Sequence, residues 1–380
     1  MMSEIKMTPL KQHLIKLIKL HGPIPISSYM TEALTNPKHG YYVTQNPFGV
    51  KGDFITAPDV SQMFGELIGL WFADVWLKMN KPQKIFLLEL GPGNGSLMKD
   101  FMRVLKVLPE FVEAIEIHFV EASPQLIEIQ KDKFKNFPCK KYWHETVKSA
   151  LNATVGAPTY IIANEFFDAL PIRQFQKGIL GWHERMVGVD KENEDLKTML
   201  APFAVAEVTL PEGLRDAELH SVIEVSPMAE YLMVEICNHI KTNQGAALII
   251  DYGYTKHRTG ETLQGVEDHK YANIYQNPGQ ADLSAHVNFC KLCEIIEKID
   301  LKPLGPIFQG KFLEYMGIEE RVKSLTKSAT PEQASDLLKS LSRLVAPDEM
   351  GTLFKVIAMV STADNDADEI EIAGFNDGPL

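Results

Sequence analysis

Cysteine is scarce in this sequence, and long apolar runs are missing from it. Among 380 residues there are only four cysteines, Cys139, Cys237, Cys290 and Cys293, too few for a disulfide framework and typical of a reducing compartment. No apolar run approaches the roughly 18 residues that a membrane-spanning helix needs. The first residues also lack the apolar core of a signal peptide and the character of a transit peptide. We therefore expect a cytoplasmic protein without stable membrane insertion.

Positive charge is also in deficit. The chain holds 38 lysines and arginines against 50 acidic residues, which gives a formal net charge of −12. Such a surface repels phosphate backbones, so general nucleic-acid binding is disfavoured. It would suit a basic protein segment, although solubility alone explains an acidic balance. The rest of the composition is globular, and the length allows a main domain with a smaller one or with large insertions.

Short apolar runs alternate with helical segments in the middle of the chain. Strands are predicted at KIFLLEL, IEIHFVEA, PTYIIANEF and GAALIIDYGY, with a weaker one at KKYWH and a further one, GTLFKVIAMVS, at the far edge of the sheet. Strands that alternate with helices indicate βαβ units and a parallel sheet. Because the runs are apolar throughout, we expect this α/β sheet to be covered on both faces.

The segments divide into three expected parts. Residues 1–80 form an N-terminal helical region with a loop rich in Gly and Pro, and residues 81–360 hold the sheet. Insertions at about 168–243 (antiparallel strands) and 306–350 (helices) are expected to build a second lobe over the carboxyl edge of the sheet. The acidic, polar tail over 361–380 is expected to be disordered.

The stretch LLELGPGNGSL places three glycines directly after the first predicted strand. Gly91, Gly93 and Gly95 are spaced G-x-G-x-G, whereas the dinucleotide fingerprint would require its third glycine at Ser96. Glu89 just before them is a poor neighbour for a pyrophosphate, but it suits a cofactor that carries ammonium and sulfonium cations. S-adenosylmethionine carries both cations and NAD carries neither, so the loop favours a methyl donor over a dehydrogenase cofactor.

Polar residues also end the later strands. Glu121 ends the second strand, where an acid can accept hydrogen bonds from both ribose hydroxyls; a solvated strand-end acid is the alternative. Asn164, Glu165 and Asp168 follow the fourth strand, at the sheet edge where ligands bind. Asn164 or Asp168 can instead cap a turn before Pro171.

His286 and two cysteines recur further on at helical spacing. His286 is expected to open a helix, where it could accept a proton or simply close the wall of a cleft. Cys290 and Cys293 invite a zinc site, but structural zinc normally needs four ligands and no second pair exists. We predict no metal and interpret FCKLCEIIEKI as an amphipathic helix whose buried face includes the cysteines.

Taken together, LLELGPGNGSL, FVEASPQL, ANEFFDALP and LIIDYG resemble the class I S-adenosylmethionine-dependent methyltransferases. More narrowly, GDFITAPDVSQMFGELIG, NEFFDALPIRQF, GQADLSAHVNF and GKFLEYMGIEER resemble the MidA family. The resemblance covers about 23–360 and implies a seven-stranded, Rossmann-like methyltransferase sheet. It implies a cofactor held by Glu89, Gly91, Pro92, Gly93, Gly95, Glu121 and Asn164, and covered by a loop that brings Asp53, Phe54, Ser61 and Phe64 near.

The resemblance also implies a substrate. Mitochondrial members of the family symmetrically dimethylate an arginine on a respiratory complex I subunit, and this chain, without a presequence, is expected to be a bacterial cytoplasmic member. A guanidinium is a poor nucleophile, and nearby carboxylates can bind its N–H groups and concentrate electron density on the attacking nitrogen. Glu165, with Asp168 and His286, is therefore the catalytic candidate. A methyltransferase for another target, or an idle assembly chaperone that binds the cofactor, are the alternatives.

Overall fold

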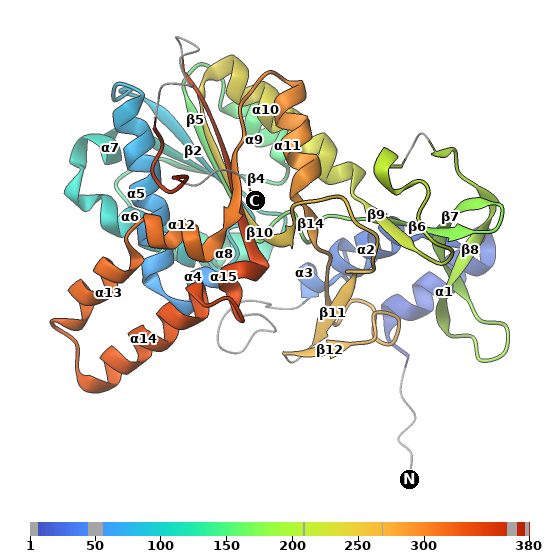
Figure 1. Ribbon diagram of the computed structural model, residues 1–380. Helices are drawn as coiled ribbons and strands as arrows, with labels where there is room; N and C mark the ends of the chain where they lie inside the picture. The colour runs from blue at the N-terminus through green and yellow to red at the C-terminus, as the bar shows by residue number, and fades with distance from the viewer. Residues whose placement is uncertain (1–6, 45–55, 208–209, 268, 363–370, 377–379) are drawn as a thin grey trace. The chain divides into compact units, whose positions relative to one another are not determined.

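The computed structural model describes residues 7–44, 56–207, 210–267, 269–362, 371–376 and 380, which fall into two compact units (Figure 1). Unit 1 comprises Met1–Phe54, Asp168–Glu230 and Lys256–Asn288, and unit 2 comprises the rest of the chain. The N-terminal segment expected as one region is thus divided between the units. The helices expected as an insertion at 306–350 are part of unit 2.

Unit 2 is built on an open sheet whose strands follow the order β15-β16-β10-β5-β2-β3-β4. Neighbours from β10 to β4 pair in parallel, whereas β16 is antiparallel to both of its neighbours. The seven strands along this path are those that the resemblance implies for an α/β methyltransferase sheet. Its strands are β2 (Ile85–Leu90), β3 (Ile115–Val120), β4 (Lys141–His144), β5 (Thr159–Asn164), β10 (Gly245–Tyr254), β15 (Leu304–Phe308) and β16 (Phe354–Ser361).

The predicted position of one strand in the sheet was wrong. GTLFKVIAMVS was expected at the far edge, but β16 lies inside the sheet and β15 takes the edge beside it. The run LGPIF of β15 contains a glycine and a proline, which are depleted in strand interiors and tolerated at edges. Its short length and composition hid it from the pattern of apolar runs.

Helices cover both faces of this sheet, with α5, α6 and α7 on one side and α9, α10 and α11 on the other (Figure 1). The most apolar, α5, buries Trp71, Phe72 and most of its other side chains in the same core as Leu87 and Ile162 of the sheet. The first turn of α10 is assigned to unit 1. The helices are α4 (Ala57–Val60), α5 (Gln62–Lys78), α6 (Ser96–Val104), η1 (Leu105–Val107), α7 (Pro109–Ala114), α8 (Pro124–Phe134), α9 (Val147–Ala153), α10 (Pro227–Asn243), α11 (Phe289–Lys298), α12 (Gln309–Tyr315), α13 (Ile318–Thr326), α14 (Pro331–Val345) and α15 (Met350–Leu353).

Unit 1 combines antiparallel strands with the first helices of the chain. One sheet follows the order β1-β7-β6-β9, and β8 also pairs with β7. A smaller sheet follows the order β12-β11-β13. The side chain of Thr8 accepts a hydrogen bond from the Lys11 N–H and so caps the first helix. The elements are α1 (Pro9–His21), β1 (Ile24–Pro25), α2 (Ile26–Thr35), α3 (Tyr41–Thr44), β6 (Arg173–Gly178), β7 (Gly181–Val189), β8 (Leu196–Ala204), η3 (Glu212–Leu214), β9 (Val222–Val225), β11 (Gln264–Glu267), β12 (Lys270–Ala272), β13 (Asp282–Ser284) and β14 (Val287–Asn288).

Part of the acidic tail packs on unit 2, contrary to the expected disorder over 361–380. The Trp71 indole N–H donates to the Ala373 carbonyl at 3.0 Å, and the Phe375 ring contacts the rings of Trp71 and Phe312. Two apolar side chains, Ile372 and Phe375, provide this anchor within an otherwise polar stretch. Among the described helices, none has both the length and the hydropathy that a bilayer crossing requires.

A buried carboxylate joins three helices of unit 2. Glu66 on α5 is 1% exposed. It accepts hydrogen bonds from the Arg103 guanidinium on α6 and, at 2.7 and 2.9 Å, from the Arg321 guanidinium on α13. The buried charge is therefore compensated by two cations. Removing it would leave the Arg321 guanidinium without this charged acceptor, whereas Arg103 would keep its ion pair with Asp100. Two segments of the family resemblance, GDFITAPDVSQMFGELIG and GKFLEYMGIEER, meet at this ion pair.

We expect Glu66→Gln to lower the free energy of unfolding by about 3 kcal/mol, because one partner of a buried ion pair is lost. Urea unfolding followed by circular dichroism would measure the change. Lys323→Ala, which removes the exposed ion pairs of α13, is the control and should cost less than about 1 kcal/mol. Equal effects of the two changes would contradict the role of Glu66.

Candidate functional site

The glycine loop follows β2 and turns sharply toward α6. Gly91, Gly93 and Gly95 have φ angles of +64°, +53° and +77°, a region that only glycine enters without strain. The loop is held by hydrogen bonds from the Gly91 N–H to the Val120 carbonyl and from the Gly95 N–H to the carbonyl of the buried Pro92. The bare backbone that the sequence predicted is therefore present at the carboxyl end of a central strand.

A residue that the sequence analysis overlooked fastens this loop. The Asp59 carboxylate on α4 accepts hydrogen bonds from the Asn94 amide at 3.1 Å and from the Ser96 hydroxyl at 2.8 Å. Asn94 in turn accepts from the Ser96 N–H at the start of α6. Asp59 lies in the segment APDVSQMFGELIG, but only the fold reveals that this segment reaches the glycine turn.

Glu89 is buried beneath the glycine loop. Its side chain is 3% exposed, and its Oε2 atom has no hydrogen-bond partner among the described residues. Burial raises the pKa of Glu89 to about 8; the charge of Lys133 opposes this rise and that of Glu121 adds to it. A cation bound at the loop would favour the ionised carboxylate, so this acid is matched to a positively charged ligand.

Glu121 follows the neighbouring strand β3 and is 8% exposed. Its Oε1 atom accepts from the Ser123 N–H at 2.8 Å, and its Oε2 atom accepts from the Gln130 amide at 3.2 Å. Burial raises the pKa of Glu121, and these hydrogen bonds oppose the rise. Each oxygen keeps a second lone pair for a further donor, such as a ribose hydroxyl. Ser123 occupies the N-cap position of α8, but its side chain makes no capping hydrogen bond.

Glu165 stands at the end of β5 in a strained backbone conformation. Its φ angle is +49°, which is costly for a residue with a side chain. Its N–H donates to the Ile250 carbonyl at 2.9 Å, and its Oε1 atom accepts from the Ala57 N–H at 3.1 Å and from the Asn164 amide at 3.4 Å. The Oδ1 atom of Asn164 is buried without a hydrogen-bond partner within the described chain. Strain of this kind is typical of functional sites.

Asp251, within β10, holds the turn that follows Glu165. Its carboxylate is fully buried and accepts from the N–H groups of Phe166, Phe167 and Tyr252 at 3.2, 3.0 and 3.0 Å. These contacts give the Asp251 carboxylate a structural role in holding the turn after Glu165. Asp251 fixes the backbone directly after the strained residue, whose own N–H donates to the Ile250 carbonyl.

The other two catalytic candidates belong to unit 1. The Asp168 carbonyl accepts from the Ala285 N–H at 2.9 Å, which joins the NEFFDALP segment to the segment that carries His286. His286 does not open a helix as expected: it lies between β13 and β14, and its N–H donates to the Thr262 hydroxyl at 2.9 Å. The helix begins only at Phe289, because two bridging strand residues intervene.

The covering segment is described in part. Asp53 and Phe54 lie outside the described residues. The Ser61 hydroxyl accepts from the Met63 N–H and caps α5, and Phe64 is completely buried in the core of unit 2. These contacts explain both side chains structurally, and their contact with a cofactor stays a prediction.

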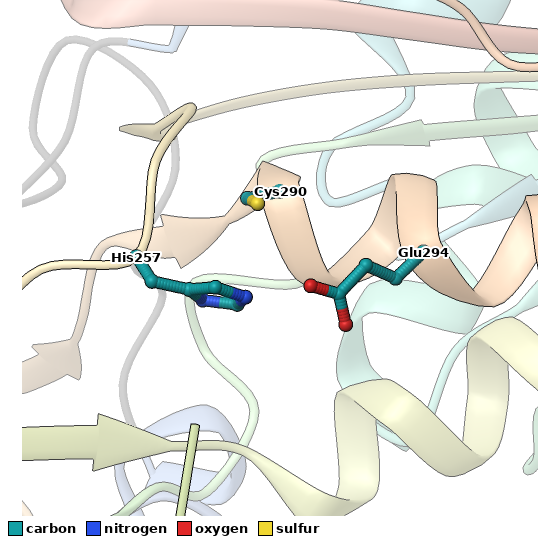
Figure 2. A group of neighbouring side chains, drawn as sticks. All are labelled: His257, Cys290 and Glu294. Atoms are coloured by element: carbon teal, nitrogen blue, oxygen red, sulfur yellow. The ribbon is translucent and has the colours of Figure 1, made fainter. Parts of the chain in front are cut away.

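Helix α11 carries Cys290 and Glu294 one turn apart (Figure 2). His257, which Figure 2 also labels, belongs to unit 1. The buried face of the helix consists of Phe289, Leu292, Ile295 and Ile296, whereas both cysteines of the segment are half-buried at its margin. Packing of the helix therefore depends on its large apolar residues rather than on the cysteines.

The residues around the glycine loop fit S-adenosylmethionine. The orphaned buried oxygen of Glu89 suits its cations, the glycine turn leaves room for it, and the second lone pairs of Glu121 suit its ribose hydroxyls. A Cβ atom built at Gly95 would lie 2.5 Å from the Phe134 ring, so this part of the turn is also closed to larger residues by its own packing. Methyl transfer needs a methyl group activated by a sulfonium, and this cofactor supplies it when bound.

We expect Gly93→Val to raise the Kd for S-adenosylmethionine at least about tenfold, because a β-branched residue at positive φ is strained and its side chain fills the turn. Isothermal titration calorimetry measures the affinity. Gly156→Val is the matched control, since Gly156 also has a positive φ but no atom lies within 4 Å of the place that a Cβ would take there. Unchanged affinity in Gly93→Val would remove the basis for placing the cofactor here.

Cofactor binding should release the proton of Glu89. With a pKa of about 8, Glu89 is mostly protonated at pH 7, and nearby cations would lower this pKa. Affinity for S-adenosylmethionine should therefore rise with pH up to about 8, and more steeply in the wild type than in Glu89→Gln. Calorimetry in two buffers with different ionisation enthalpies counts the protons. Equal proton release in the wild type and the variant would be evidence against this coupling.

Comparisons with known proteins indicate the same cofactor. The sequence matches the family described as "Putative S-adenosyl-L-methionine-dependent methyltransferase" over residues 67–307. It is 38% identical to the human "Protein arginine methyltransferase NDUFAF7, mitochondrial" over 94% of this chain and 85% of that protein. The Drosophila melanogaster homologue is 34% identical, with 93% and 86% covered.

A solved structure extends the likeness to the whole fold. A likely methyl transferase from Burkholderia thailandensis bound to S-adenosyl-homocysteine has a TM-score of 0.81 and 27% identity, with 98% of this chain and 93% of that chain covered. The predicted fold, cofactor and enzyme class are confirmed by these matches. The chain belongs to this family of S-adenosylmethionine-dependent methyltransferases.

Proposed function

We propose that the protein methylates an arginine side chain of a protein substrate. The observation that carries the proposal is Glu165, a carboxylate at the end of β5 whose strained backbone is fixed by Asp251 and by the Ile250 carbonyl. The curated relatives are named as protein arginine methyltransferases, which supports a guanidinium as the group that meets this carboxylate.

The catalytic role proposed for Glu165 follows from the weak nucleophilicity of a guanidinium. A guanidinium is protonated and delocalised, so its nitrogens attack weakly. A carboxylate that accepts its N–H groups concentrates electron density on the attacking nitrogen and fixes its orientation. The amide of Asn164 and the N–H of Ala57 hold the carboxylate in one position, and such positioning lowers the entropic part of the barrier. Asp168 and His286 are proposed to assist by accepting a proton from the substrate.

The substrate and the setting are proposed more narrowly from the resemblance to the MidA family. A subunit of a complex I-type respiratory assembly in a bacterial cytoplasm is the first target to test, and symmetric dimethylarginine is the product to look for. The net charge of −12 supports a basic segment around the target arginine.

The test is mass spectrometry of lysate proteins after incubation with the enzyme and isotopically labelled S-adenosylmethionine. We expect label on arginine, and a loss of at least about 100-fold in rate for Glu165→Gln, the scale of an acid–base contribution, with the affinity for S-adenosylmethionine retained. Glu113→Gln, an exposed residue on α7, is the control and should be fully active.

Other outcomes would redirect the proposal. Label on a different side chain or on a small molecule would replace arginine as the target. Cofactor binding without any transfer would favour an assembly chaperone. Full activity in Glu165→Gln would remove Glu165 from the mechanism.

A further inference from the structure

Gln130 is a completely buried amide in the middle of α8. Its Nε2 atom donates to the Gly93 carbonyl at 2.7 Å and to Glu121 Oε2 at 3.2 Å. Its Oε1 atom accepts from the Trp143 indole N–H on β4 at 2.9 Å. Both amide hydrogens and the carbonyl are thus used, which fixes the orientation of the side chain.

Two of the partners of Gln130 lie beyond the ends of the neighbouring strands β2 and β3. Gly93 belongs to the turn after β2, and Glu121 follows β3, so no hydrogen bond of the strand ladder reaches either the Gly93 carbonyl or the Glu121 carboxylate. One amide joins the two groups. Any shift of Gln130 would therefore change the spacing between the glycine turn and the acid.

We propose that Gln130 is a positioning residue of the cofactor site, which sets the Glu121 carboxylate and the Gly93 backbone at the spacing that the ribose and the rest of the cofactor require. The inference rests on the proposed role of Glu121 in binding ribose hydroxyls and is independent of the methylated target. Gln130 acts through Gly93 and Glu121, and its own polar atoms are all engaged within the protein.

A second buried amide, Gln309, allows a comparison. Gln309 on α12 is also completely buried, and its Nε2 atom donates to the Leu344 carbonyl at 3.0 Å. Its partner is a helix carbonyl of α14 rather than a residue of the glycine turn or the ribose site. Gln309 is therefore the matched control for the loss of a buried amide.

The experiment compares Gln130→Met with Gln309→Met by calorimetry, with S-adenosylhomocysteine and its 2′,3′-dideoxyribose analogue as the probes. Both variants should lower Tm. Gln130→Met should raise the Kd for S-adenosylhomocysteine at least about tenfold and reduce the preference of the wild type for the hydroxylated ribose. Gln309→Met should leave the Kd and that preference within about twofold, since a buried hydrogen bond lost elsewhere affects mainly stability.

A milder variant covers the case in which Gln130→Met does not fold. Trp143→Phe keeps a ring on β4 but removes the N–H that orients Gln130, and it should raise the same Kd several-fold with a small change in Tm.

Three results would overturn the inference. The first is a Kd in Gln130→Met, or in Trp143→Phe, that stays at the wild-type value. The second is an equal loss for both probes, which would mean that Glu121 is not the group being positioned. The third is a wild type that binds both probes equally, which would overturn the ribose role of Glu121 and the inference with it. None of these results bears on whether arginine is the target.

Discussion

The site depends on one constraint: the backbone after β2 must pass close to a ligand while an acid is buried directly beneath it. Three glycines with positive φ allow the turn, and the fold places the Glu89 carboxylate in a region where burial disfavours its charge. The two features are coupled, because larger side chains in the turn would exclude the very cation that stabilises the acid. We propose that a bound cationic cofactor stabilises the ionised Glu89 carboxylate, which burial alone disfavours.

The rest of unit 2 holds this turn in place from several directions. Asp59 reaches it from α4, Gln130 reaches it from α8, and the hydrogen bond between Gly91 and Val120 joins it to β3. Further from the turn, Glu66 joins α5 to α6 and α13 through two guanidinium groups. Each contact joins residues far apart in the chain, so the geometry of the turn is a property of the whole unit. Such supporting contacts are what preorganised sites require.

Contacts from other parts of the chain also hold the end of β5, where the backbone itself is strained. Glu165 occupies a left-handed backbone conformation, and Asp251 accepts hydrogen bonds from the N–H groups that follow it. A strained residue persists only where neighbouring contacts outweigh its strain. The arrangement fixes the direction of the Glu165 carboxylate at the same edge of the sheet as the glycine loop. Ligands of open parallel sheets bind at this edge.

Local patterns of the sequence were sufficient for most strands of the main sheet and for the glycine turn, because apolar periodicity and positive φ are properties of a few consecutive residues. The family resemblance added the cofactor and the enzyme class. Tertiary structure alone decided that β15 and not β16 lies at the sheet edge, that Ile372 and Phe375 anchor the tail, and that His286 precedes its helix instead of opening it. It also decided the partners of Asp59, Glu66 and Gln130, because pairing between residues tens or hundreds of positions apart depends on which surfaces the packed elements bring together, and no local pattern records that.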